Sequence, residues 1–273
     1  MRLRIYLNSN NFILTKTKFK KMGKKYIPYK FSPNLLEGVI QERIGSFIMM
    51  VKHKNNILKC HCPTMCSIGN IKNLKNRPCL LSHSSDPGRN TQYTVEAISL
   101  DSVNTKNKKW IGINQTKANK YFEYFLKQGR FKQIFPNGVK NVQREKFFNS
   151  SKFDFKIDDT FLEIKTPLHF LSMKIPKNIE IKKTKLSPGN RLLKHFKDLM
   201  NYLKLKKRAI MVVICMYDSD GFMRESKENC YKYDEVDKIA KECNELGLET
   251  YQVNLKMNCK EIDVDKVFKL NMK

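Results

Sequence analysis

The sequence predicts a mixed α/β protein, α+β overall, in which a small β-barrel is followed by a mixed sheet flanked by helices. Short strand-like runs separated by Pro and Gly fill 37–100, which is typical of a small barrel. Apolar residues recur at helical spacing in 118–129. A near-continuous apolar run at 208–217 predicts a strand covered by helices on both faces of a sheet. With 273 residues, the chain has room for one large or two small domains.

The strands of the first part are short and punctuated by turn residues. The runs 47–51 and 57–61 flank Asn55-Asn56 and predict a hairpin, and 91–100 predicts another strand. Breaks between them fall at Pro63, Gly69, Pro78 and Pro87-Gly88. Because several short strands are packed into so few residues, we expect a barrel. The OB-type barrel is the natural candidate for a basic one.

The second part alternates helices and strands. Ser187 and Pro188 are typical of a helix N-cap and first turn, and the helix they predict has an apolar stripe. A helix over 234–246 and a strand over 248–255 follow the strand at 208–217. The stripe consists of Leu192, Phe196, Leu199 and Leu203. Alternation of this kind after a hairpin predicts a mixed sheet.

These patterns divide the chain into four segments. We expect a basic N-terminal extension over 1–34, an OB-like nucleic-acid-binding domain over 35–107, a second domain over 108–256 and a polar C-terminal tail over 257–273. The first 36 residues contain nine Lys or Arg and no acid. That composition fits an organelle transit peptide or a basic tail that contacts nucleic acid.

The charge of the chain predicts its partner. Lys and Arg total 53 against 26 Asp and Glu, a formal net charge of +27. Such an excess indicates a polyanion, either nucleic acid or an anionic membrane surface, unless it is only a compositional habit of a Lys- and Asn-rich chain. We expect nucleic acid, with DNA first and RNA as an alternative. A second copy of the chain, in a homodimer, is a further candidate partner.

The cysteines predict a reducing compartment. None of the eight forms a C-x-x-C motif, and Cys215 lies in an apolar run, so a secreted disulfide framework is disfavoured. We expect an intracellular protein of the cytoplasm, nucleoid or nucleus, with organelle targeting as the alternative. Cys60, Cys62 and Cys66 beside His61 invite comparison with a zinc cluster, but buried or loop thiols explain them better. No apolar run reaches the roughly 20 residues of a membrane span.

One predicted hairpin carries the chemistry. The runs 153–157 and 160–165 flank Asp158-Asp159, which predicts a two-residue loop. In that register Asp154 lies opposite Glu163, and directly opposed side chains share a face roughly 5 Å apart. Lys165 follows Glu163 by two and joins the same face. Two carboxylates and an ammonium therefore converge.

A cluster of this kind suits metal-assisted phosphodiester hydrolysis. Mg²⁺, or Mn²⁺ in its place, binds carboxylate oxygens and lowers the pKa of a bound water. A solvated Glu163–Lys165 ion pair is the plainer interpretation of the same spacing. The apolar neighbours of these residues favour a buried sheet instead, where an unpaired charge is costly.

These residues resemble a known family. Ser151-Lys152-Phe153-Asp154-Phe155 and Phe161-Leu162-Glu163-Ile164-Lys165 are similar to the Ser-Arg-x-Asp-Phe and Tyr-x-Glu-Val-Lys blocks of the sugar fermentation stimulation protein A (SfsA) family. The resemblance implies an OB-like domain followed by a restriction-endonuclease-like domain with a PD-(D/E)xK site. It implies a Mg²⁺-dependent nuclease in which Asp154, Glu163 and Lys165 are catalytic.

The resemblance extends to further site residues. Glu145 matches a family glutamate nine residues before the Asp-Phe block, which implies a third metal ligand beside Asp154 and Glu163. Arg191, Lys194 and His195 match the family pattern Arg-Gly-x-Lys-His, with Leu192 in place of the glycine. This match implies that Arg191 and Lys194 bind phosphate and that His195 orients catalytic groups.

Positions in the barrel match the family as well. They include Glu37-Gly38, Arg43, Phe47, His61-Cys62-Pro63, Arg89, Thr94 and Glu96, and further along Asn114 and Asn119. The match implies that Arg43 and Arg89 contact nucleic acid. The chain departs from the family's His-Cys-Pro-Asn-Thr-Gly loop at Thr64-Met65-Cys66, where the glycine is lost, so the loop shape there is in doubt.

Two functions remain open on this sequence. One is a metal-dependent nuclease acting on DNA or RNA, and the other is a non-catalytic DNA-binding regulatory protein on an endonuclease-like scaffold. A binder retains salt-sensitive affinity when Glu163 or Lys165 is replaced and shows no metal-dependent cleavage.

Overall fold

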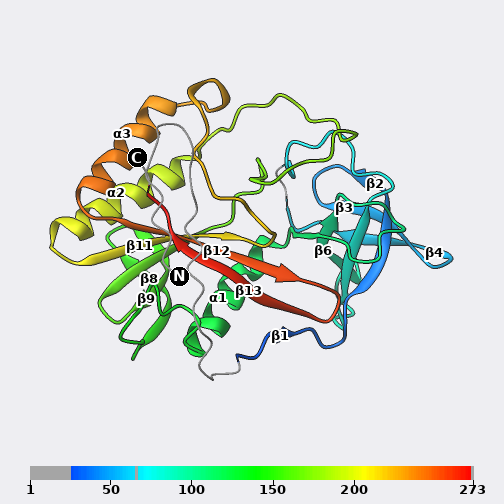
Figure 1. Ribbon diagram of the computed structural model, residues 1–273, viewed down its shortest axis with the longest axis horizontal. Helices are drawn as coiled ribbons and strands as arrows, with labels where there is room; N and C mark the ends of the chain where they lie inside the picture. Colours follow the sequence, from blue (N-terminus) through cyan, green and yellow to red (C-terminus); the bar gives the residue numbers. More distant parts are fainter. Residues whose placement is uncertain (1–25, 65–66, 272–273) are drawn as a thin grey trace, which may run out of the picture.

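The computed structural model describes residues 26–64 and 67–271, and two sheets organise them (Figure 1). The smaller sheet has the strand order β4-β3-β2-β5-β6-β7, and an additional β4–β6 pairing closes β2 to β6 into a five-stranded barrel. Its strands are β2 (Leu36–Ile44), β3 (Ile48–His53), β4 (Asn56–His61), β5 (Pro78–His83), β6 (Tyr93–Ser99) and β7 (Trp110–Gly112).

The larger sheet has seven strands in the order β1-β13-β12-β11-β10-β9-β8. β10, β11 and β12 pair in parallel, and the other neighbours pair antiparallel. The strands are β1 (Tyr29–Lys30), β8 (Val142–Phe148), β9 (Ser151–Ile157), β10 (Thr160–Lys165), β11 (Arg208–Cys215), β12 (Glu249–Met257) and β13 (Glu261–Lys269). The prediction of a barrel followed by a mixed sheet with helices is confirmed.

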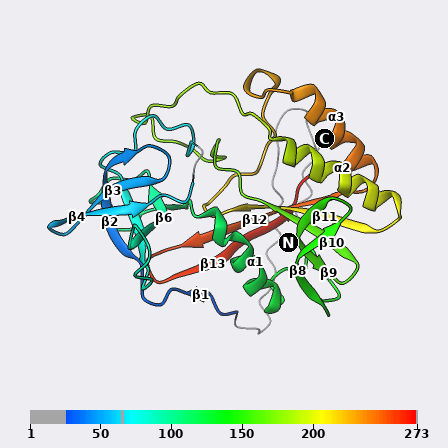
Figure 2. The same cartoon turned by 180° about the vertical axis from the view of Figure 1, so that it is seen from behind.

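Helices cover both faces of the larger sheet (Figures 1 and 2). Helix α1 (Ala118–Lys127), which follows the short helix η1 (Gln115–Lys117), packs its apolar residues in one core with Phe155 and Leu162. Helices α2 (Asn190–Lys204) and α3 (Tyr233–Glu245) form a second core with Phe153 and Phe161. A third short helix, η2 (Lys227–Asn229), precedes α3. The hairpin of β9 and β10 therefore lies between two cores.

The two sheets meet where β7 approaches the end of β11. The backbone N–H of Gly112 donates to the carbonyl of Met216 at 2.7 Å. A Cβ atom on Gly112 would lie 2.6 Å from Cβ of Met216, which is closer than real contacts allow. Glycine is needed at this junction because any side chain would push the sheets apart.

The structure corrects both chain ends of the predicted layout. Residues 261–269, predicted as part of a polar tail, form β13, which pairs with β12. Its polar sequence is compatible with a strand because only one of its nine residues is buried. Within the predicted N-terminal extension, Tyr29 and Lys30 pair with β13. Residues 1–25, where the basic tail or transit peptide was expected, lie outside the described residues.

Other boundaries differ by a few residues. β7 belongs to the barrel sheet, so that sheet reaches Gly112 rather than ending at 107. The first hairpin turns at Lys54 and Asn55, because Asn56 already starts β4. Helix α2 begins after Gly189 without a side-chain cap, so Ser187 is not its N-cap.

Candidate functional site

The β9–β10 hairpin has the predicted loop and register. Thr160 pairs with Ile157, and the next two pairs follow in step, which confirms those three pairings. Asp158 opens the turn at φ +50°, a conformation that aspartate tolerates better than most residues. The ladder stops before Asp154 and Glu163. There the N–H of Ile164 donates to Oδ2 of Asp154 at 2.7 Å.

Asp154 is therefore held at the point where the two strands separate. Its Oδ2 binds the backbone N–H of the residue directly after Glu163, and its Oδ1 accepts a hydrogen bond from Nδ2 of Asn119 at 2.7 Å. Asn119 is the second residue of α1. The carboxylate of Asp154 is thus fixed by helix α1 and by strand β10. On β10 it contacts the backbone of Ile164, the residue next to Glu163.

Glu163 has one satisfied oxygen and one unsatisfied oxygen. The residue is 4% exposed. Its Oε1 accepts hydrogen bonds from Nζ of Lys165 at 2.5 Å and from Nδ1 of His195 at 2.8 Å. Its Oε2 is buried and has no hydrogen-bond partner among the described residues. A buried polar atom without a partner costs roughly 1–3 kcal/mol and calls for an explanation.

The pKa values of the two acids are shifted in opposite directions. Burial raises the pKa of Asp154 above its usual range, and the nearby charge of Glu163 adds to that rise. Burial also acts to raise the pKa of Glu163. The hydrogen bonds and charges of His195 and Lys165 outweigh it, so the net pKa of Glu163 is lowered.

His195 connects Glu163 to the start of α2. Its ring is buried against Phe153, with ring centroids 5.5 Å apart. Nε of Arg191 lies 3.5 Å from Nε2 of His195 and donates to it. Nδ1 is the ring nitrogen that faces Oε1 of Glu163 and donates to it. The structure thus brings together Asp154, Glu163, Lys165, His195 and Arg191.

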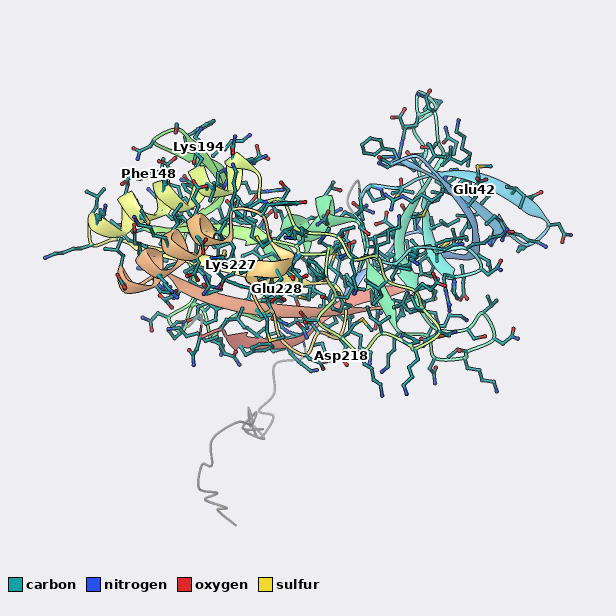
Figure 3. All side chains as sticks on the ribbon, turned by 90° about the horizontal axis from the view of Figure 1, so that it is seen from above. Glu42, Phe148, Lys194, Asp218, Lys227 and Glu228 are labelled. Atoms are coloured by element: carbon teal, nitrogen blue, oxygen red, sulfur yellow. The ribbon has the colours of Figure 1, made fainter. Side chains whose placement is uncertain are left out.

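Lys194 and Glu145 lie at the edge of this group. Nζ of exposed Lys194 donates to the carbonyl of Ser150 at 2.6 Å, in the turn between β8 and β9 (Figure 3). Glu145 is exposed, has φ +54°, and pairs with Nζ of Lys152 at 2.8 Å. It occupies a gap in the β8–β9 ladder. Its carboxylate is engaged by Lys152, so its predicted role as a metal ligand stays a prediction.

The barrel arginines are not part of this group. Nη2 of Arg43 donates to the carbonyls of Ser46 and Thr64, at 2.9 and 2.6 Å. Nη2 of Arg89 donates to Oγ1 of Thr94 at 3.0 Å. Both side chains tie barrel loops and strands together. Their predicted contacts with nucleic acid stay predictions.

Sequence reasoning missed two arrangements. It noted Asn119 as a helix residue, but not its bond to Asp154, which is 35 residues away. It noted Glu96, but not the bonds that bury this acid in a network with Lys117 and Asn114. Both are contacts between elements that short spacings do not predict. The available signal was that Asn119, Asn114 and Glu96 match positions of the family pattern.

The donor set for a metal is small. Across 26–64 and 67–271, no group of three or more His, Cys, Asp or Glu side chains is arranged to hold an ion. Asp154 and Glu163 are the two carboxylates at the end of the hairpin away from its turn. Cys60 and Cys62 are free and buried, and burial raises the pKa of Cys60 to about 12, so this thiol is a poor metal ligand. Cys66 lies outside the described residues.

Comparisons with known proteins agree on one family. A sugar fermentation stimulation protein homolog of Synechococcus sp. (strain JA-2-3B'a(2-13)) is 28% identical over 203 residues, which cover 68% of this chain and 73% of the relative. The homolog of Clostridium perfringens (strain 13 / Type A) is 24% identical over 242 residues, covering 86% and 96%. No family model matches the chain.

A solved structure has the same fold. SfsA of Pyrococcus furiosus, solved in complex with Ca²⁺, superposes with a TM-score of 0.67 over 91% of this chain and 100% of that one, at 18% identity. In sequence the chain is similar to proteins of the SfsA family, and its fold is that of SfsA. No helix of the described residues is long and apolar enough to cross a membrane.

Proposed function

We propose that this SfsA-family chain binds nucleic acid and cleaves its phosphodiester bonds with the help of a divalent cation held by Asp154 and Glu163. The observation that carries the proposal is the buried Oε2 of Glu163, which has no partner among the described residues. It lies beside a second acid whose pKa is raised by burial and by the charge of Glu163. An arrangement of this kind is unfavourable without a cation.

The residues fit a hard divalent cation. Mg²⁺ prefers oxygen ligands, retains several waters, and is often held by only one or two carboxylates plus substrate phosphate. The two acids of the hairpin meet that requirement, and Mn²⁺ accepts the same ligands. The relative from Pyrococcus furiosus was solved in complex with Ca²⁺, another cation that takes oxygen ligands. We therefore propose Mg²⁺ or Mn²⁺ as the cofactor.

The chain's own residues would position the reacting groups. When bound, such a cation polarises a phosphoryl oxygen and lowers the pKa of a coordinated water. Asn119 and the N–H of Ile164 fix the carboxylate of Asp154. Lys165, with a side chain 33% exposed, neutralises Oε1 of Glu163 and presents a positive charge to an incoming phosphate or water. His195 positions Glu163 from the opposite side.

Basic side chains near these acids would guide the nucleic-acid backbone. Arg191 and Lys194 are exposed on the first turns of α2, and exposed Lys152 lies on the adjacent strand β9. Together with the net charge of +27, they favour binding of a polyanion in front of the hairpin. Base identity is not read by phosphate contacts of this type.

A non-catalytic nucleic-acid-binding protein is the second candidate. The charge of the chain supports it directly, and the donor set at the hairpin holds fewer than three ligating side chains. In such a protein, the acids of the hairpin would serve only folding or regulation. Binding and cleavage must therefore be measured separately.

The test compares cleavage and binding in one set of proteins. Labelled single- and double-stranded DNA and RNA are incubated with wild type and Lys165→Ala in Mg²⁺, Mn²⁺ or EDTA. We expect divalent-dependent cleavage that Lys165→Ala lowers on the order of 10²-fold, because one electrostatic stabiliser is removed. Binding in EDTA should change by less than about threefold. Lys207→Ala is the matched control, since Lys207 pairs with Asp159 at 2.8 Å at the far end of the same hairpin.

Wild type that cleaves none of these substrates in either metal would refute the nuclease. Equal cleavage by wild type and Lys165→Ala would refute the assigned site. If binding in EDTA persists without cleavage, the second candidate is correct.

A further inference from the structure

A cavity of about 410 Å³ opens beside the candidate site. It is bounded by α2, α3 and the central strands, and segments 166–172 and 222–230 cover it. Figure 3 labels Lys227 and Glu228, which lie in the chain between the lining residues Glu225 and Cys230. The volume falls within the range of roughly 300–1,000 Å³ typical of small-molecule sites.

The cavity shares a wall with the proposed catalytic group. Lys165 and Gln115 both line it. Nζ of Lys165 is bonded to Glu163, and Nε2 of Gln115 donates to the carbonyl of Thr166, directly after Lys165. Whatever enters the cavity therefore lies beside the proposed phosphate position.

The lining suits a flat ring with polar edges. Four aromatic side chains contribute to a mainly apolar wall: Phe170, Phe196, Phe222 and Tyr233. Thr250 also lines the cavity, is 2% exposed, and has a hydroxyl without a hydrogen-bond partner among the described residues. Glu225 also lines the cavity, and burial raises the pKa of its carboxyl group. The cavity thus combines stacking surfaces with unsatisfied polar capacity.

We propose that this cavity binds one unpaired nucleobase of the strand whose phosphate lies at Lys165. The inference rests on the proposed function for its phosphate position. Aromatic side chains bind bases by stacking, and the buried polar groups can bond base edges. A base inside a duplex is covered by its neighbours and must leave the stack to enter a pocket. The preferred substrate is therefore single-stranded, or has an unpaired nucleotide next to the cleaved bond.

The test is crosslinking with a base analogue. Single-stranded DNA with one 5-iodouracil is irradiated with the full-length wild type in EDTA, and crosslinked peptides are identified by mass spectrometry. The analogue reacts with an aromatic ring on which it stacks. We expect crosslinks at Phe196, Phe222 or Tyr233. A duplex with the same base paired should crosslink about tenfold less at these residues.

A filled cavity provides the second readout. Ala240→Phe adds a ring to the wall of α3, since Ala240 lines the cavity and is 9% exposed. We expect it to abolish the cavity crosslinks while DNA affinity in EDTA falls about tenfold or less. Leu246→Phe, at the exposed end of α3, is the matched control and should crosslink as wild type does. If Ala240→Phe does not fold, the single-strand and duplex comparison on wild type still decides.

The outcomes separate this inference from the nuclease proposal. Crosslinks that map only outside the cavity, or equally to single strand and duplex, overturn the base pocket even if the protein cleaves DNA. Crosslinks in the cavity of a protein that cleaves nothing support the pocket and refute the nuclease.

Discussion

Two buried glutamates, one on the barrel and one on the larger sheet, differ in a single respect. Glu96 on β6 is 3% exposed and Glu163 on β10 is 4% exposed. Each binds a lysine at 2.5 Å, Lys117 or Lys165, whose side chain is about one third exposed. By burial and by charge partner they are nearly the same.

The two glutamates differ in the other hydrogen bonds that their carboxylate oxygens accept. Oε1 of Glu96 accepts a second hydrogen bond from Oγ of Ser82 at 2.5 Å, and Oε2 accepts one from Nδ2 of Asn114 at 2.9 Å. Oε2 of Glu163 has no partner among the described residues. A fully satisfied buried carboxylate holds the fold together, whereas one with a vacant oxygen is ready for a ligand. Satisfaction of hydrogen bonds therefore separates the two roles where burial does not.

Replacing Glu163 should have the largest effect on activity. Glu163→Gln removes the charge on Oε2 but keeps the shape, so we expect cleavage to fall on the order of 10²–10³-fold. The free energy of unfolding should stay within about 1 kcal/mol of wild type, because a charge without a complete set of partners is lost. Cleavage assays and chemical denaturation measure the two effects. Activity within twofold of wild type would contradict the role of Glu163.

Asn119 tests the electrostatics of Asp154. Burial and Glu163 raise the pKa of Asp154, and the hydrogen bond from Asn119 acts against that rise. Asn119→Ala should raise this pKa further. Metal affinity, which needs the ionised acid, is lost as pH falls through that pKa, so the loss should begin at a higher pH in the variant.

At a pH near the pKa of Asp154, we expect Asn119→Ala to bind Mn²⁺ about 10–100-fold more weakly than wild type. A loss of this size is typical of groups that orient a metal ligand. The two proteins should converge at high pH, where Asp154 is ionised in both. The raised pKa also means that Asp154 costs stability as pH rises through it, so its stabilising contribution is confined to low pH. Identical pH profiles for the two proteins would count against a bond between Asn119 and Asp154.

Replacing Glu96 should show the opposite pattern. Glu96→Gln disturbs the network of Ser82, Lys117 and Asn114, and we expect a loss of about 1–3 kcal/mol in unfolding free energy. For a chain of this size each kcal/mol is roughly 2–4 °C in Tm. Cleavage per folded molecule should remain at the wild-type level. A stable Glu96→Gln protein without activity would remove the contrast between the two acids.

Glu145 should matter least. Its carboxylate is exposed and paired with Lys152, so Glu145→Ala should change cleavage less than about twofold. Glu145→Gly is expected to stabilise the chain by about 1 kcal/mol, because it removes a side chain from a residue with φ +54°. Thermal melts and cleavage assays test both variants. A hundredfold loss in Glu145→Ala would restore it as a third metal ligand.

The sequence predicted the hairpin well because local rules define it. Alternating β-formers around Asp158-Asp159 fix the loop and the register, and three pairings follow. The same rules placed Asp154 opposite Glu163, but the ladder ends before this pair, since Asp154 accepts the N–H of Ile164. At this point a side-chain oxygen accepts the hydrogen bond that a backbone carbonyl accepts in a regular ladder. The local sequence pattern does not predict this exchange.

Contacts between distant segments could not be predicted in this way. The bond from Asn119 to Asp154 and the network around Glu96 depend on how α1 and β7 pack, and no spacing in the sequence specifies this. Strand β13 was missed because five of its nine residues are charged, as in a polar tail. The vacant oxygen of Glu163 likewise becomes visible only when all neighbours are placed.

Titration of Mn²⁺ into the protein, followed by calorimetry, tests the central claim most directly. Wild type and Glu96→Gln should bind with equal affinity, and Glu163→Gln should bind at least about tenfold more weakly. Equal affinity of all three proteins, or no binding by wild type, would contradict the assignment of the vacant Glu163 oxygen to a metal.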